Sequence, residues 1–281
     1  MKNYFNKLAA IILTVLISTS FIFAQSGYHL RYKMQTGKTY RYKGVSTSKV
    51  TQEVMGREMT INTNVNSVDR ITVKNQSENG NMTLIVSYDS IKIHSSNPVK
   101  DTTIFLKDLI GKRIKMDLTN LGVVKNKMML DTIKNNSRLV QSFKNQSFNF
   151  IRLPDKEVYI GSKWQSTKID TVNNQMGKII VNSTFNYTLA GKEKKNGRDC
   201  LKITFTVNTK LNGKGNLRGM DLYIEGKGKG SGSADFDPNE GVLILLNSNS
   251  NHQMTITASG NRNMIIPVTQ STKTVKTLIS N

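Results

Sequence analysis

The feature that most constrains the fold is an alternation of apolar and polar residues with a period of two. After residue 27 it recurs along most of the chain, for example at 82–88, 178–187 and 220–225. A period of two places every second side chain on the same face of a β-strand, whereas a helix needs a period of 3.6. Val, Ile, Thr and Tyr fill these runs, and these residues favour strands. The pattern predicts a mainly β protein.

Turn signals recur between the alternating runs. Glycine and asparagine tolerate the positive φ that short hairpin turns require. Many strands joined by short turns predict a mostly antiparallel meander. The turn signals are Thr36-Gly37, Asn79-Gly80, Asn196-Gly197, Asn212-Gly213 and Asn239-Glu240-Gly241.

One segment, 127–150, departs from the alternation. Its apolar residues recur at mixed intervals of three and four, which predicts one or two short helices broken near Asn135-Asn136. Leu153-Pro154-Asp155 then predicts a helix stop and a turn, so we place a linker at 150–157. The apolar residues are Met128, Met129, Ile133, Leu139, Val140, Phe143 and Phe148.

The chain also reads as doubled. Residues 34–42 align with 158–166, each with a glycine three residues before an aromatic that opens a strand, and 117–124 resemble 235–243. We therefore predict two related antiparallel, strongly curved sheets, half-barrel or barrel-like, with a short helical segment between them. The alternative is chance, since any all-β chain contains some glycine-to-aromatic strand starts. The predicted divisions are a signal peptide at 1–24, a first β half at 25–127, the helical segment and linker at 128–157, and a second β half at 158–281.

The N-terminus has the three-part pattern of a secretory signal peptide. Lys2 and Lys7 precede an apolar run at 8–17, and Ala24 ends the segment on a small residue before Gln25. We expect an exported, periplasmic or extracellular protein, cleaved near Ala24-Gln25, with no membrane span in the mature chain. No cysteine follows the apolar run, so we expect no lipid anchor there.

The composition is strongly basic, with a formal net charge of +21. Such a surplus favours anionic partners, such as lipid headgroups or acidic polymers of a cell envelope. The alternative is a solvated surface, because the lysines are spread along the chain. No block of five like charges occurs, so we expect no specific nucleic-acid partner.

Residues that could carry chemistry are few and scattered. His29, His94 and His252 lie far apart, outside any HxH, HExxH or CxxC spacing, so we predict no metal site. Cys200 is the single cysteine and excludes an intramolecular disulfide. It starts the alternation at 200–207 and is interpreted as a buried hydrophobe, not a nucleophile. We expect no catalytic residue, no cofactor and no enzymatic activity.

Two motifs imitate ligand sites. The run 226–232 alternates glycine with Lys227, Lys229 and Ser231, but no helix follows it, as a phosphate-binding loop would require. We interpret it as a bend at a barrel corner, with both lysines pointing to the opposite face, and a ligand contact is the alternative.

Asp235, Asp237 and Asn239 resemble the first half of a calcium loop. The glycine comes one position late, at Gly241, and no bidentate glutamate follows. A turn, with Pro238 fixing φ and Asp237 capping the amides, is the preferred interpretation.

Methionine is frequent, with 12 in the chain. Its unbranched, polarisable side chain suits a pocket that adapts to acyl chains, and its alternative role is to fill a core short of Leu and Phe. The methionines in or beside predicted strands are Met34, Met55, Met59, Met82, Met116, Met220, Met254 and Met264.

The stretches 30–42, 153–164, 191–203 and 230–243 resemble an uncharacterised family of secreted β-proteins common in Bacteroidota-type cell envelopes. The resemblance implies export and a β fold, and it carries over no catalytic residue. More loosely, the layout is similar to the half-barrels that carry lipids or lipoproteins across the periplasm.

Together these observations favour a non-enzymatic, exported binding protein for an amphiphilic or lipid-like anionic ligand. The closest alternative is a structural or protein–protein interaction module of the cell envelope. A third is a hydrolase that uses Cys200 or a serine with a histidine brought close by folding.

Overall fold

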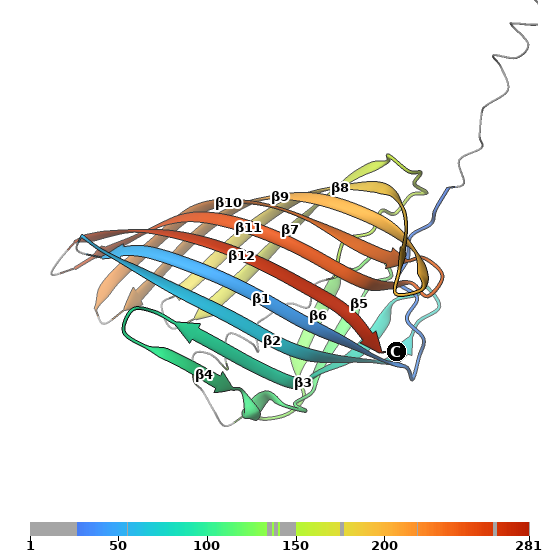
Figure 1. Ribbon diagram of the computed structural model, residues 1–281, viewed down its shortest axis with the longest axis horizontal. Coiled ribbons are helices and arrows are strands. Elements are labelled where there is room, and N and C mark those ends of the chain that lie inside the picture. Colours follow the sequence, from blue (N-terminus) through green and yellow to red (C-terminus); the bar gives the residue numbers. More distant parts are fainter. Residues whose placement is uncertain are drawn as a thin grey trace, which may run out of the picture.

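The computed structural model describes residues 27–54, 56–133, 137, 140, 150–174, 177–217, 219–260 and 263–280. Twelve β-strands form one sheet, and every pair of neighbouring strands is antiparallel (Figure 1). The strands are β1 (Thr39–Val54), β2 (Arg57–Gln76), β3 (Met82–Ser96), β4 (Asp101–Phe105), β5 (Ile114–Leu118), β6 (Val124–Met129), β7 (Lys163–Asn174), β8 (Gly177–Lys195), β9 (Arg198–Leu217), β10 (Met220–Asp237), β11 (Val242–Ser259) and β12 (Met264–Ser280), with a 3₁₀ turn at Lys107–Leu109.

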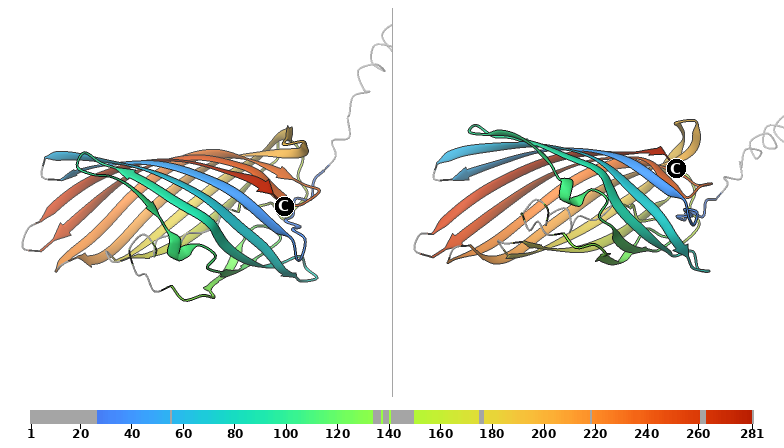
Figure 2. Two further views of the ribbon diagram at one scale, coloured as in Figure 1. Left: turned by 60° about the horizontal axis from the view of Figure 1, so that its bottom comes forward. Right: turned by 90° about the horizontal axis from the view of Figure 1, so that it is seen from below.

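The sheet order is β6-β5-β3-β2-β1-β12-β11-β10-β9-β8-β7, and β4 pairs with β3 beside this path. The sheet curls into an open barrel (Figures 1 and 2). The mainly β, antiparallel prediction is confirmed. The prediction of two sheets is wrong, because β1 pairs with β12 and joins the two halves of the chain into one. Among the described residues β6 and β7 remain edges, so the sheet does not close.

Most of the predicted turns are present. Asn196 and Gly197 both have positive φ, 50° and 73°, as a two-residue hairpin turn requires. Gly37, Gly80 and Gly241 also have positive φ in turns. The turn predicted at Asn212-Gly213 is wrong, because β9 runs through it without a break. There Gly213 makes room for a neighbouring side chain, since a Cβ would lie 3.0 Å from Ile179 Cγ1.

The helix predicted from residue 127 is wrong at its start, because Met128 and Met129 belong to β6. The backbone there pairs with β5. The rest of that segment lies mostly outside the described residues, as does the predicted signal peptide. In the part of the chain that the structure describes, no helix combines the length and apolar character needed to cross a membrane.

One end of the barrel, which we call the plugged end, holds the main hydrophobic core. The N-terminal segment crosses it, where the Tyr32 amide donates to the Asn120 carbonyl and the Lys33 amide donates to the Gly241 carbonyl, at 2.8 and 3.1 Å. The stretch predicted as a linker packs against the same core, with Ile151 and Leu153 buried. Strand residues of both halves complete this core, among them Tyr42, Ile71, Tyr187, Ile203, Phe236 and Leu246.

The opposite end, which we call the open end, carries the connections β1–β2, β7–β8, β9–β10 and β11–β12 and lies at the left of Figure 1. Side chains that point into the barrel form an inward-facing set. The pairing of residues across strands identifies its members from the plugged end along every strand. Tyr42, Leu278 and Asp69 are paired neighbours in that set, and residues two apart from them face the same way. The outward-facing set lies between them and is mostly Thr, Ser, Asn, Gln and Lys.

Candidate functional site

The inward-facing residues change character along the barrel. On β12, Leu278 lies in the plugged-end core, Thr272 and Thr274 follow, and Val268 and Met264 lie toward the open end. On β11 the same order is Leu246, then Ser248 and Ser250, then Met254 and Ile256. The interior thus has a polar middle between two apolar regions. This polar middle, which we call the hydroxyl belt, consists of Ser46, Ser48, Ser248, Ser250, Thr272 and Thr274.

The belt hydroxyls are half-buried and partly paired across strands. Ser46 and Thr274 lie 3.0 Å apart between their hydroxyl oxygens, and the Thr272 hydroxyl donates to Ser48 at 3.3 Å. A hydroxyl can donate one hydrogen bond and accept two, so each pair retains hydrogen-bonding capacity. The belt therefore offers polar groups to the interior.

An ion pair lies where the belt meets the core. Lys276 Nζ is 2.6 Å from Asp69 Oδ2, and the two side chains are only 14% and 4% exposed. Ser67 donates to Asp69 Oδ1 at 2.9 Å, which satisfies a second oxygen of the buried carboxylate. At Gly44, opposite Lys276 in the register, a Cβ would lie 2.8 Å from the Ser67 hydroxyl oxygen, so the missing side chain makes room for that hydroxyl. The pair neutralises both charges at the floor of the belt.

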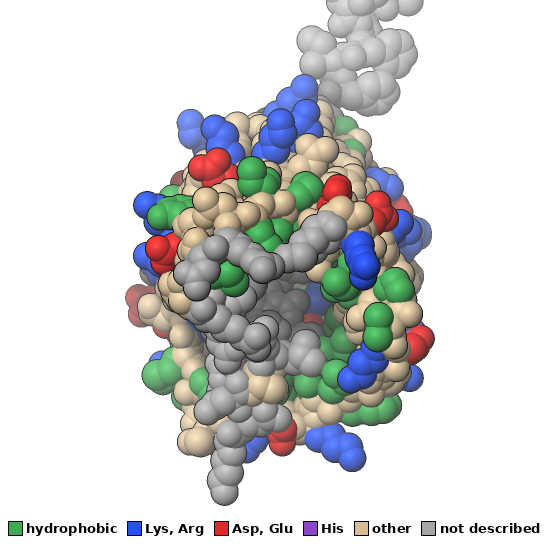
Figure 3. Space-filling view, turned by 90° about the vertical axis from the view of Figure 1, so that its left-hand side faces the viewer, with side chains coloured by type: hydrophobic (Ala, Val, Ile, Leu, Met, Phe, Trp, Pro, Cys, Tyr) green, Lys and Arg blue, Asp and Glu red, His purple; other side chains and the backbone are tan. Residues whose placement is uncertain are grey.

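The open end is lined by methionines that we call the methionine rim: Met59, Met220, Met254 and Met264. Leu222, Ile224, Ala258 and Val268 are buried beside them, outside the main core. Seen from this end, the molecule is hollowed, with hydrophobic side chains around the hollow (Figure 3). Met34 on the N-terminal segment and Met82 and Met116 on strands are core residues, as the core-filling interpretation of methionine predicts.

The glycine run of β10 faces this interior. Gly226, Gly228, Gly230 and Gly232 all belong to the inward-facing set, and Lys227 and Lys229 are exposed on the other face, as predicted. The space above the glycines is occupied by neighbours from β9 and β11. A Cβ at Gly226 would lie 2.7 Å from Met254 Cγ, and one at Gly230 would lie 2.9 Å from Val207 Cγ1. β10 continues through the run without a break, so the glycines are a close-packing feature of the strand and mark no corner of the barrel.

Two lysines approach each other on the inner side of the two edge strands. Lys127 on β6 and Lys168 on β7 both belong to the inward-facing set. Burial, and then the nearby Lys168 ammonium, lowers the pKa of Lys127 to about 8. Lys168 also pairs with Asp170 at 2.8 Å. This side of the interior therefore carries a positive charge surplus at neutral pH.

The structure keeps the three histidines in different settings. His29 on the N-terminal segment lies near Glu157, and Nε2 of His94 on β3 lies 2.7 Å from Asp101 on β4. His252 faces the interior of β11, where burial lowers its pKa. Among the described residues, no group of three or more His, Cys, Asp or Glu side chains could hold a metal ion.

Cys200 is buried, as the alternation predicts. Burial, followed by the nearby Asp237 and Asp235 carboxylates, raises the pKa of its thiol to about 11. Such a thiol remains protonated and a poor nucleophile at neutral pH. Asp237 itself accepts hydrogen bonds from the Asn239 and Glu240 amides, at 2.9 and 3.1 Å, so the turn interpretation is confirmed.

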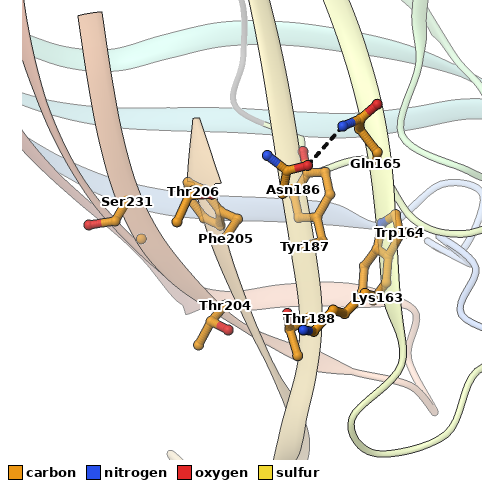
Figure 4. Close-up of a pocket in the computed structure, with 11 residues that line it drawn as sticks. Lys163, Trp164, Gln165, Asn186, Tyr187, Thr188, Thr204, Phe205, Thr206 and Ser231 are labelled. Carbon is orange, nitrogen blue, oxygen red and sulfur yellow. Dashed lines mark hydrogen bonds between the residues drawn. The ribbon is translucent and has the colours of Figure 1, made fainter. Parts of the chain in front are cut away.

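The convex face holds shallow polar grooves. One of about 710 Å³ crosses β7 to β10 between short outward-facing side chains (Figure 4). Gln165 donates to Asn186 Oδ1 there at 2.9 Å, and Thr206 and Ser231 continue the same row. Lys163 is the charged residue of its lining. This groove offers hydrogen bonds to solvent-borne groups but no arrangement for acid–base chemistry.

Comparison with known protein families and with curated proteins finds no match for this chain. The resemblance to secreted envelope β-proteins stays a prediction.

Sequence reasoning missed the hydroxyl belt. Its signal is the run 247–253, Asn-Ser-Asn-Ser-Asn-His-Gln, which has no apolar residue although it crosses the sheet within β11. A strand that covers a dry core alternates apolar with polar residues. A strand polar on both faces indicates water or a polar ligand on its inner side.

Proposed function

We propose that this protein is a non-catalytic binding protein that holds an amphiphilic, lipid-like anionic ligand inside its open barrel. The observation that carries the proposal is the methionine rim, which the strand register places at the open end, the end where the molecule is hollowed (Figure 3). Apolar side chains at a solvent-accessible opening are costly unless something apolar covers them. Burying an acyl chain there contributes about 0.8 kcal/mol per CH₂ group.

The positive charge of the protein favours a ligand with an anionic headgroup. The net charge is +21, and the inward-facing Lys127 and Lys168 add positive potential on the inner side of the open seam between β6 and β7. A positive interior raises the local concentration of anions. Together with the leader pattern at 1–24, this is consistent with an exported protein that meets lipids or lipid-like molecules in a cell envelope.

An interaction module is the second candidate. β7 is a twelve-residue edge strand in the described part of the chain, and Ile169 on its outer side is 72% exposed. An edge of this kind is a template for strand addition by another protein. The hydrolase alternative is weaker, because burial and then the nearby carboxylates raise the pKa of the Cys200 thiol to about 11, which keeps it protonated at neutral pH.

The test is native mass spectrometry of the full chain, expressed with its leader in a bacterium and purified from the periplasm. We expect an added mass that extracts into organic solvent. Met254→Lys, which places a charge on the methionine rim, should remove that mass. Thr255→Lys changes the adjacent, outward-facing residue and serves as the matched control. A clean apo mass that persists after incubation with lipids would overturn the carrier proposal and favour the interaction module.

A further inference from the structure

The hydroxyl belt lies deeper in the barrel than the methionine rim. Along β12 the order from the open end inward is Met264, Val268, Thr272, Thr274 and Lys276. Strand β11 repeats this order next to it, because Met254 pairs with Val268 and Ser250 pairs with Thr272. A molecule that enters at the open end therefore meets apolar side chains first and hydroxyl groups second.

The belt is not the surface of a dry core. Its serines and threonines are half-buried, and the outward-facing neighbours on the same strands, such as Asn249 and Lys273, are polar too. Unsatisfied hydroxyl groups in an apolar interior are costly, so a folded chain places them against water or a polar partner. The belt therefore presents hydroxyl groups with remaining hydrogen-bonding capacity, which water or a polar ligand can use.

The charges next to the belt are compensated. Lys276 and Asp69, where the belt meets the core, are paired at 2.6 Å. What the belt itself presents is a set of neutral donors and acceptors. Such a set matches hydroxyl groups, which also both donate and accept. A terminal phosphate has at most one O–H to donate and is mainly an acceptor, so it gains less from the acceptor oxygens of the belt.

We infer that the ligand binds head-first, with a polyhydroxylated headgroup on the hydroxyl belt and its acyl chains along the methionine rim. This inference rests on the proposed function and adds the orientation and the headgroup class. A lipid with a glycerol or sugar unit beyond its phosphate has the required order of groups.

Two phospholipids with identical acyl chains separate the headgroup from the chain. Phosphatidylglycerol carries a free glycerol, and phosphatidic acid ends at the phosphate, while both are anionic. Binding of each to the full chain is measured by native mass spectrometry in competition. We expect phosphatidylglycerol to bind about fivefold or more tightly, as one or two additional hydrogen bonds predict.

The double variant Thr272→Val/Thr274→Val removes two belt hydroxyls and keeps the β-branched shape. It should abolish the preference and leave phosphatidic acid binding unchanged. Thr269→Val, on the exposed outer face of the same strand, is the control and should retain the preference. Ser48→Ala/Ser250→Ala removes two belt hydroxyls on β1 and β11 instead. It should also abolish the preference, and it replaces the valine variant in the test if that variant does not fold.

The outcomes separate the two proposals. Equal binding of both lipids by the unmodified protein, or a preference that survives both belt variants, overturns the head-first inference and leaves the carrier function standing. Failure of the unmodified protein to bind either lipid overturns both.

Discussion

At the scale of single residues, the inward glycines of β10 show how a missing side chain shapes the barrel. Gly232 faces the interior between Phe205 and Ser248, its paired neighbours on β9 and β11. A methyl group there would overlap the Asn247 carbonyl oxygen and the ring of Phe205. The close approach of the two neighbouring strands thus depends on glycine.

Gly232→Ala should therefore destabilise the protein by about 1–3 kcal/mol, because overpacking at this site displaces backbone as well as a ring. Chemical denaturation followed by circular dichroism measures the difference. Gly191→Ala is the control, since a Cβ at that strand position meets nothing within 4 Å. Equal midpoints for the two variants would contradict the packing role of the run.

At the scale of elements, the N-terminal segment fills the plugged end of the barrel and connects segments that are far apart in the sequence. The Tyr32 hydroxyl donates to the Ile151 carbonyl at 3.2 Å and accepts from the Ile151 amide at 3.1 Å. Its ring contacts Phe150 and Phe236 edge-on, with centroids 5.5 Å apart in each case. One buried side chain thus connects the segment to 150–158 and to β10.

Tyr32→Phe should cost about 1–3 kcal/mol, since it leaves the buried backbone groups of Ile151 without their partner while keeping the ring. Thermal unfolding and amide hydrogen exchange at Ile151 both report this loss. Tyr223→Phe, on an exposed outward position of β10, should change stability by less than about 0.5 kcal/mol. A Tyr32→Phe variant as stable as the original would show that the hydroxyl bridge contributes nothing net.

At the scale of the whole molecule, the central feature is the pairing of β1 with β12. It runs from Arg41↔Ser280 to Gln52↔Val268 and makes the first and last strands of the chain neighbours. The main core takes residues from both halves, Ile71 and Tyr88 from one and Tyr187 and Phe236 from the other. The predicted halves are therefore interdependent parts of one sheet.

We expect the full chain to unfold in a single cooperative transition, and segments 25–127 and 158–281 expressed separately to show none. Each half alone would expose a new edge strand and its share of the core. Mixing the two purified segments should restore part of the signal of the intact protein. Two separate transitions in the intact chain, or a folded isolated half, would contradict this expectation.

Local patterns in the sequence were sufficient for the class of fold. The period of two predicted the strands, and Asn196-Gly197 predicted a hairpin, because both signals depend on residues close together in the chain. They also predicted that Lys227 and Lys229 face away from the glycines of β10, since neighbouring strand residues point to opposite faces. The buried setting of Cys200 followed from the same alternation.

Tertiary structure decided how these strands combine. The β1–β12 pair joins residues more than 200 positions apart in sequence, and no local signal specifies which distant edges meet. This pair makes one sheet where two were predicted. The tertiary structure also places Gly213 in close packing against Ile179 on β8, where the sequence predicted a turn. It also sorts the methionines into core and rim, and it aligns Ser250 with Thr272 and Ser48 in one belt. Each of these features depends on the register between strands, and that register is determined only when strands far apart in the sequence pair with one another.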